Sequence, residues 1–168
     1  LATLGRELRG ARAVVQGFGN VGEAAVRAFD ECGATVIATG RSDAKLAVVK
    51  AQGADYVLNV RGEDGGLRSF RDEVKALTGG RGADVVYECV GSDETLDDGL
   101  RLARPGGKVL LVASDKWLYP FFRAWGDLVV YGDGAAAILL DGDAQTTPGW
   151  GAIRASAVHY GAAIDNPW

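Results

Sequence analysis

The chain has 168 residues, of which 18 are basic and 22 acidic, and its formal net charge is -4. A domain of this length can bury a core without a metal or disulfide staple. The charge balance excludes a general nucleic-acid or anionic-membrane surface. No long apolar run and no basic-plus-apolar leader is visible, so neither a membrane span nor a secretory signal is expected. Cys32 and Cys89 lack metal-ligand spacing, which favours free thiols in a reducing, cytoplasmic compartment and no metal site.

Along most of the chain, short apolar runs alternate with helical patterns. A short lead-in helix is predicted over 1–12. Strands are predicted over 13–16, 35–39, 56–59, 83–88 and 108–113. Helices are predicted over 20–32, 44–52 and 66–77 and from Ser92 to before Pro105, with Ser42 and Ser92 as N-caps. Beyond them, residues 129–131 and 135–140 are predicted to form a hairpin, and 153–158 one further strand.

The Val/Ile/Leu-rich strands are typical of a parallel sheet that is buried on both faces. Right-handed crossovers then give an α/β, doubly wound parallel sheet (Rossmann) in the order 3-2-1-4-5, with a C-terminal β-rich extension. Residues 1–114 are expected to form a dinucleotide-binding domain. Residues 115–168 are expected to form an aromatic linker and the β-rich extension, packed on the same sheet or as a small lobe.

A Gly-x-Gly-x-x-Gly motif joins the first strand to the first helix. Gly17 permits a tight turn, Gly19 has no Cβ to keep a phosphate away, and Gly22 lets the helix lie close to the sheet. The helix N-terminus offers unpaired N–H groups to an anion. The motif therefore predicts a pyrophosphate site, the alternative being a tight turn that binds nothing. The candidate loop comprises Gly17, Phe18, Gly19, Asn20, Val21 and Gly22.

Three segments of the chain resemble three protein families. Residues 5–38, above all 5–10 and 15–22, closely resemble the nucleotide-binding domain of glutamate and leucine dehydrogenases. Residues 127–160 are similar to a core segment of type III ketoacyl synthases. Residues 40–113 look like the cofactor domain of medium-chain dehydrogenases and quinone oxidoreductases, a resemblance carried by 41–46, 52–55, 77–86, 88–91 and 104–107. Three families in one short chain suggest a chimera.

The resemblances imply a nicotinamide cofactor. Where the amino-acid dehydrogenases place an acidic residue for the ribose 2′-hydroxyl, this chain has Arg41, which favours a 2′-phosphate, and Ser42 could add a hydrogen bond. NADP(H) is therefore preferred and NAD(H) is the alternative. Arg41 could instead be a solvated surface residue whose charge Asp43 offsets. Val90 and Gly91 match the place where the medium-chain family brings backbone beside the nicotinamide ribose.

No catalytic residue can be assigned from the sequence. Cys89 is expected to be a small buried thiol and His159, the single histidine, an ordinary strand-end residue. The chain is interpreted as an NAD(P)(H)-binding, oxidoreductase-type cofactor domain, with hydride transfer as its reaction if it catalyses one. The alternatives are a recombined Rossmann scaffold without activity and an acyl-transfer protein. The aromatic run 117–125 is expected to bury the appended strands, or else to form a homodimer surface.

Overall fold

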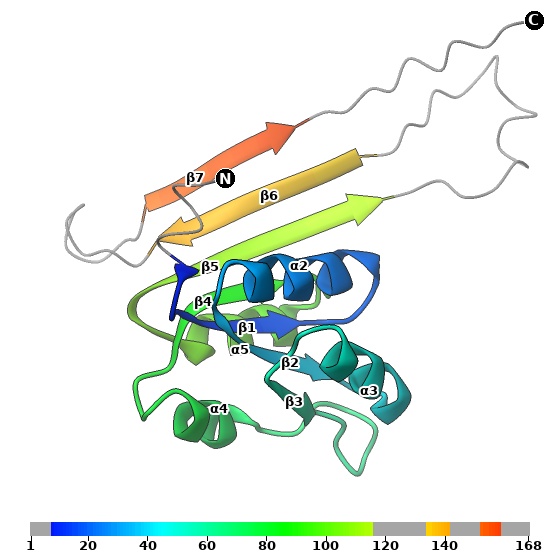
Figure 1. The fold of residues 1–168 in the computed structure, drawn as a ribbon. Coiled ribbons are helices and arrows are strands. Elements are labelled where there is room, and N and C mark those ends of the chain that lie inside the picture. Colours follow the sequence, from blue (N-terminus) through cyan, green and yellow to red (C-terminus); the bar gives the residue numbers. More distant parts are fainter. Residues whose placement is uncertain (1–7, 116–133, 142–151, 159–168) are drawn as a thin grey trace, which may run out of the picture.

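The protein is described by a computed structural model, which places residues 8–115, 134–141 and 152–158. Strands and helices alternate through the first five strands, as predicted (Figure 1). The helices are α2 (Asn20–Glu31), α3 (Asp43–Ala51), α4 (Arg71–Leu77) and α5 (Asp93–Leu102). The strands are β1 (Arg12–Gln16), β2 (Thr35–Gly40), β3 (Tyr56–Asn59), β4 (Ala83–Glu88), β5 (Ala103–Asp115), β6 (Gly134–Asp141) and β7 (Ala152–Val158). None of the helices in these ranges is long and apolar enough to cross a bilayer.

The strands form one sheet in the order β3-β2-β1-β4-β5-β6-β7. The first five are parallel and confirm the predicted order 3-2-1-4-5. At the centre, Val14 of β1 lies between Ile37 of β2 and Val86 of β4. The chain order reverses between β1 and β4, so a crevice is expected at the carboxyl ends of these two strands.

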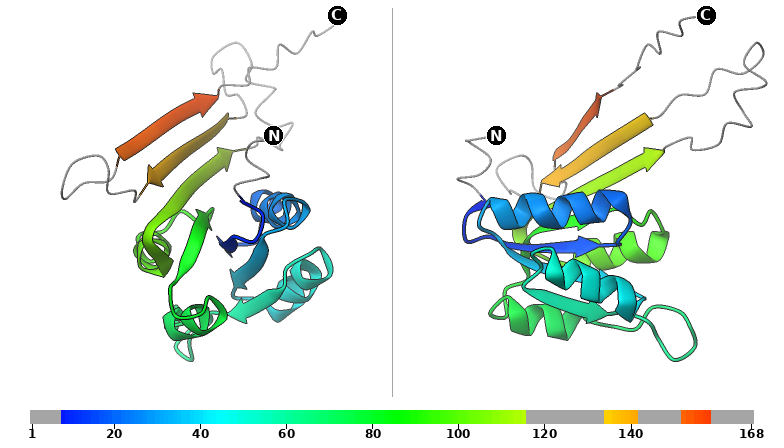
Figure 2. Two further views of the ribbon diagram at one scale, coloured as in Figure 1. Left: turned by 60° about the vertical axis from the view of Figure 1, so that its left-hand side comes forward. Right: turned by 45° about the vertical axis from the view of Figure 1, so that its right-hand side comes forward.

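Helices cover both faces of the parallel part of the sheet (Figure 2, left). On one face, α2 and α3 pack on a core that includes Val15, Val26 and Val49. On the other face, α4 and α5 enclose a core that includes Val14 and Val86. Successive residues of a strand point to opposite faces, so neighbouring valines of β1 serve different cores. Because both faces of each strand are buried, the strands are continuously apolar and do not alternate between apolar and polar residues.

Side-chain caps start α3 and α5 as predicted. The Ser42 side chain accepts a hydrogen bond from the Lys45 N–H at 3.4 Å, at the start of α3. Ser92 caps α5, and Thr95 completes a capping box with it. Such caps satisfy backbone N–H groups that have no partner within the helix.

The predicted helix over 66–77 is wrong in its first part, because α4 begins only at Arg71. Residues 61–67 instead form a loop closed by a β-bridge between Arg61 and Leu67. Within it, Asp64 Oδ1 accepts the Gly66 N–H at 2.9 Å, and Gly65 has φ of 84°. A left-handed glycine and a side chain that captures a backbone N–H both compete with helix formation.

Beyond β5 the sheet continues as two antiparallel strands, which confirms the β-rich extension. β6 pairs with β5 from Lys108↔Asp141 to Asp115↔Gly134, and β7 pairs with the other edge of β6. Both edges of β6 are therefore occupied by described strands, and the predicted hairpin partner of 135–140 is not among the described residues. Residues 129–131, the aromatic run 117–125 and His159 lie outside the described residues. The domain boundary at residue 114 stays a prediction.

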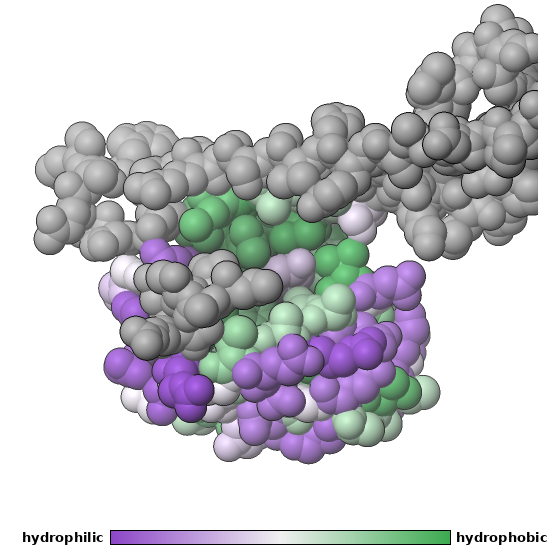
Figure 3. All heavy atoms as spheres, turned by 45° about the horizontal axis from the view of Figure 1, so that its top comes forward, coloured by the Kyte–Doolittle hydropathy of each residue, from purple (hydrophilic) through white to green (hydrophobic). Residues whose placement is uncertain are grey.

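The outer strands carry apolar side chains that belong to neither core. Val109 and Leu111 of β5 pack in the core beneath α4 and α5. Their neighbours Leu110 and Val112 face the other side of the sheet, where the core contains no residue of β5. Both are only half-buried, and apolar surface is visible beside the outer strands in Figure 3.

Two adjacent valines of α3 provide a matched test of this packing. Val49 is fully buried against β2, whereas Val48 is 49% exposed. We expect Val49→Ala to lower the free energy of unfolding by about 2 kcal/mol, because buried methyl groups are lost and a cavity remains. Val48→Ala should change it by less than about 0.5 kcal/mol. Urea unfolding of both variants checks this, and equal effects would contradict the assigned helix face.

Candidate functional site

A cavity of about 370 Å³ opens at the carboxyl ends of β1, β2 and β4. Six of the predicted site residues line it: Gly17, Phe18, Gly19, Arg41, Ser42 and Val90. Asn20, Val21, Gly22 and Gly91 lie outside its wall. Three loops that are distant in sequence thus meet at the point where the strand order reverses, which is the expected ligand position in an open α/β sheet.

The three glycines of the loop have different structural roles. Gly17 has φ of 93°, and a Cβ there would lie 2.6 Å from Val90 Cγ2. A Cβ on Gly22 would lie 2.2 Å from the Gly17 carbonyl oxygen. By contrast, a Cβ on Gly19 would meet no atom within 4 Å. The fold itself therefore requires Gly17 and Gly22 but not Gly19.

Gly19 is the N-cap of α2, and no side chain caps that helix. In α3 and α5, a serine side chain accepts a hydrogen bond from a first-turn N–H group. The first-turn N–H groups of α2 have no such side-chain acceptor. A helix start of this kind carries partial positive charge and suits an oxygen-bearing anion. The open space over Gly19 leaves room for such a group to contact the backbone, so the turn fits a pyrophosphate.

Arg41, directly after β2, is an exposed cation at the rim of the cavity. It makes no ion pair among the described residues. The carboxylate proposed to offset its charge, Asp43, instead accepts a hydrogen bond from Asn59 Nδ2 at 2.6 Å. Lys45 lines the same cavity. The sequence analysis did not single out Lys45, which is also exposed, although its position one turn after the Ser42 cap could have indicated it.

Sequence reasoning also missed the apolar wall of the cavity, which Val60, Leu67 and Phe70 supply. Val60 directly follows β3, and Leu67 and Phe70 lie in the segment before α4 that was predicted as the first part of a helix. Apolar side chains do not by themselves indicate a binding site in a sequence. Only the loop conformation brings these three to the cavity. Two of them, Val60 and Phe70, are also buried in the core beneath α4 and α5.

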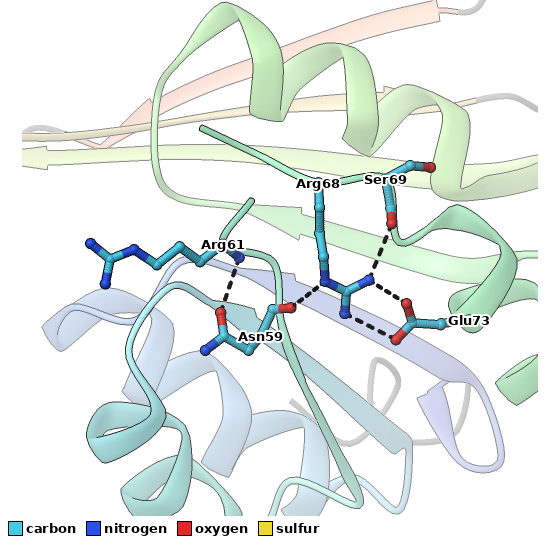
Figure 4. Close-up of polar contacts among 5 residues, drawn as sticks. All are labelled: Asn59, Arg61, Arg68, Ser69 and Glu73. Carbon is cyan, nitrogen blue, oxygen red and sulfur yellow. Dashed lines mark hydrogen bonds and ion pairs between the residues drawn. The ribbon is translucent and has the colours of Figure 1, made fainter. Parts of the chain in front are cut away.

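Arg68 holds this wall in place (Figure 4). Its Nε donates to the Asn59 carbonyl at 2.8 Å, and its Nη1 donates to the Ser69 carbonyl at 3.2 Å. The guanidinium also grips both carboxylate oxygens of Glu73 in α4. Hydrogen bonding from Arg68 holds the pKa of Glu73 below its usual value. Arg68 therefore ties the end of β3 to the start of α4, with Leu67 and Phe70 between them.

A buried carboxylate organises the turn after β4. Glu88 is 3% exposed, and its Oε1 accepts the N–H of Val90 at 2.7 Å and that of Gly91 at 3.1 Å. Thr95 in α5 donates its hydroxyl to the same oxygen at 2.9 Å. These donors compensate the desolvation of the carboxylate. They also hold the turn that places Val90 beside Gly17, and they use the Gly91 N–H for the bond to Glu88.

Cys89 is a poor nucleophile. Its thiol donates to the Gln16 carbonyl at 3.0 Å. Burial, helped by the negative charge of Glu88, raises the pKa of the thiol to about 11. The thiolate is the reactive form, so almost none is present near neutral pH. The described residues also contain no group of three His, Cys, Asp or Glu side chains that could hold a metal ion.

Thiol labelling tests this environment. In a Cys32→Ser variant, which leaves Cys89 as the remaining cysteine, we expect labelling by a disulfide reagent at about pH 8 to be at least tenfold slower than in the urea-unfolded chain. The reason is burial and the raised pKa of the thiol. Labelling as fast as in the unfolded chain would contradict the packing of Cys89.

Comparison with known proteins yields one family match, to a model described as zinc-binding dehydrogenase, over residues 20–132. It covers the segment likened to medium-chain dehydrogenases and extends into the segment 5–38 that was likened to glutamate and leucine dehydrogenases. The reported matches do not support the resemblances of 5–38 to glutamate and leucine dehydrogenases or of 127–160 to ketoacyl synthases.

Individual relatives and structures agree with the family match. An alcohol dehydrogenase of Cupriavidus necator is 41% identical over 90 residues, which are 53% of this chain and 23% of the relative. The alcohol dehydrogenase TADH from Thermus sp. ATN1 superposes with a TM-score of 0.57 at 31% identity, covering 67% of this chain and 32% of that protein. Mycobacterial Rv1454c, solved in complex with NADPH, superposes with a TM-score of 0.54 at 33% identity, covering 61% of this chain and 30% of that protein. The chain thus spans a quarter to a third of these proteins, and it belongs to the zinc-binding dehydrogenase family.

Proposed function

We propose that this chain is a cofactor-binding domain of an oxidoreductase and that it binds NADP(H) in preference to NAD(H). One observation carries the proposal: a single cavity joins the glycine turn after β1 to the cation after β2. NADP(H) would use both features, because its pyrophosphate and the 2′-phosphate on its adenosine ribose are covalently linked and are recognised together.

The glycine turn would receive the pyrophosphate. Gly19 leaves the backbone open to the ligand, and α2 directs its uncapped N-terminus to the same place. Asn20 and Val21 would contribute backbone N–H groups of the first helical turn. Gly22 would act indirectly, because its missing Cβ lets α2 start directly against Gly17.

Arg41 would distinguish the two cofactors. A guanidinium forms paired, charge-assisted hydrogen bonds with a phosphate, whereas a ribose hydroxyl offers no charge. Lys45 adds a second cation to this part of the cavity, and the Ser42 hydroxyl lies between the two in sequence. Asp43 makes no ion pair with Arg41 in the described part of the chain, and its Oδ1 accepts a hydrogen bond from Asn59.

Val90 and Gly91 would bound the nicotinamide half of the site, and Glu88 holds that turn in place. When bound, the cofactor itself supplies the chemistry of hydride transfer, and the chain orients it. No side chain in the cavity wall is assigned as an acid or base, so the substrate and the catalytic residues stay open. The cytoplasmic location and a homodimer likewise stay predictions. No observation favours the acyl-transfer alternative, given the environment of Cys89.

Parallel calorimetric titrations with NADPH and NADH test the cofactor preference. We expect NADPH to bind about tenfold or more tightly, because Arg41 would make a charge-assisted contact with the 2′-phosphate. Arg41→Ala should weaken NADPH binding by a similar factor and leave the affinity for NADH nearly unchanged. Arg27→Ala is the matched control, because Arg27 is an exposed cation of α2 that pairs with Glu23 and does not line the cavity.

Two outcomes would contradict the proposal in different ways. Equal weakening of NADPH by the Arg41 and Arg27 variants would remove Arg41 as the phosphate reader. Absence of heat and of any thermal shift with either nucleotide, in a folded sample, would favour the scaffold without ligand.

The glycine turn allows a second, independent test. Gly19→Ala should alter the free energy of unfolding by less than about 1 kcal/mol, because its Cβ enters open space and φ is -105°. It should nevertheless weaken NADPH about tenfold, since the methyl group lies where the pyrophosphate would contact the backbone. Gly22→Ala should destabilise the free protein itself, because its Cβ meets the Gly17 carbonyl. Unchanged NADPH affinity in Gly19→Ala would place the pyrophosphate elsewhere.

A further inference from the structure

A second cavity, of about 260 Å³, lies at the other end of the sheet. Its wall includes Gly82 and Ala103, which stand at the amino ends of β4 and β5, and side chains of α4 and α5. Figure 1 shows α4 toward the end of the sheet from which β1 and β2 start, away from the carboxyl ends that carry the glycine turn. The two cavities share no lining residue.

The wall of the second cavity is strongly basic. Arg71, Lys75, Arg81 and Arg101 line it, and no aspartate or glutamate does. All four cations are exposed to solvent. Four cations on one concave surface are unexpected in a chain whose net charge is -4. Their mutual repulsion is unfavourable, and together they raise the local positive potential.

Helix dipoles and ion pairs explain only part of this cluster. Lys75 and Arg101 lie in the last turns of α4 and α5, where the dipole attracts cations. Arg101 also binds Asp97 Oδ2 at 2.7 Å. Arg71, however, is the first residue of α4, where the dipole opposes a positive charge.

Arg81 also lacks a dedicated partner. The acidic side chain that it influences, Asp84, is hydrogen-bonded to Arg104 Nε at 2.5 Å and to the Arg12 N–H at 2.8 Å. Among the described residues neither Arg71 nor Arg81 makes an ion pair. Arg71 therefore lies against the helix dipole without an ion pair, and Arg81 has only the longer-range attraction of Asp84.

The loop that presents Arg81 is held rigidly. Thr78 is fully buried; its hydroxyl donates to the Val74 carbonyl at 2.8 Å and accepts the Gly82 N–H at 3.0 Å. A Cβ on Gly82, which has φ of 93°, would lie 2.8 Å from the Leu102 carbonyl oxygen. The backbone of residues 78–82 is thus held between α4 and the end of α5, which fixes the position from which Arg81 extends.

We propose that this cavity binds a compact, phosphate-bearing polyanion, at a site separate from that of the dinucleotide. Three of the four cations are arginines, whose planar guanidinium groups match phosphate oxygens in pairs. The small volume suits a diphosphate or a small phosphate ester better than a whole nucleotide. The inference does not depend on the proposed cofactor, because it rests on a different wall of the molecule.

Calorimetric titration of the full chain with inorganic diphosphate tests the site. We expect saturable binding that weakens as ionic strength rises. The double variant Arg71→Gln/Arg81→Gln should lower the affinity on the order of tenfold or more, because each lost arginine removes a charge-assisted contact. Arg27→Gln, which removes one charge from α2, should leave the affinity unchanged. Urea unfolding of the double variant confirms that these exposed substitutions leave the fold intact.

Diphosphate could also enter the glycine turn, and Gly19→Ala separates the two sites. Binding that persists in Gly19→Ala and is lost in the double variant supports the basic cavity. Binding lost in Gly19→Ala and retained in the double variant, or no saturable binding, overturns the proposal. An equal loss of diphosphate affinity in the Arg27→Gln control overturns the proposal as well, because such a loss would reflect only the change in net charge. NADPH titration of the double variant tests the cofactor site independently. The double variant should bind NADPH with the same affinity as the wild-type chain.

Discussion

The packing of α2 directly against the end of β1 is the contact on which the candidate site depends. Gly22 lies so near the Gly17 carbonyl that a single methyl group could not be inserted. Because α2 starts directly against β1, its N-terminus points into the crevice between β1 and β4 and its apolar side covers the first core. Both the packing of one sheet face and the position of the candidate anion site follow from this contact.

A buried polar group completes the crevice from the opposite side. Glu88 ends β4 in an interior position and fixes the following turn by accepting two backbone N–H groups and the Thr95 hydroxyl. Its register partner on β1 is Gln16, whose Oε1 is buried and has no hydrogen-bond partner among the described residues. The strand ends that carry the candidate site are thus polar within an otherwise apolar sheet. Such groups are tolerated where they shape a site, since buried polar atoms otherwise destabilise a core.

The two ends of the sheet differ in kind. The carboxyl end combines backbone donors, an apolar wall and the cation Arg41 in one larger cavity, which suits a long ligand with several distinct parts. The amino end has a smaller cavity in which every charged lining side chain is basic, which suits a compact anion. Family membership bears on the first of these sites only, because the relatives named above are dehydrogenases and one of them was solved with NADPH.

The sequence by itself determined the alternation of elements, the parallel strand order and the glycine turn. These depend on local periodicity, on glycine stops and on Ser42 and Ser92 caps, which act over a few residues. Only the tertiary structure decided which side chains share a cavity. The apolar wall of Val60, Leu67 and Phe70 depends on a loop that Asp64, Gly65 and Arg68 hold through contacts that periodicity does not encode. The basic wall likewise needs Arg71 and Arg101 from different helices, because charges distant in sequence act together only after the chain has folded.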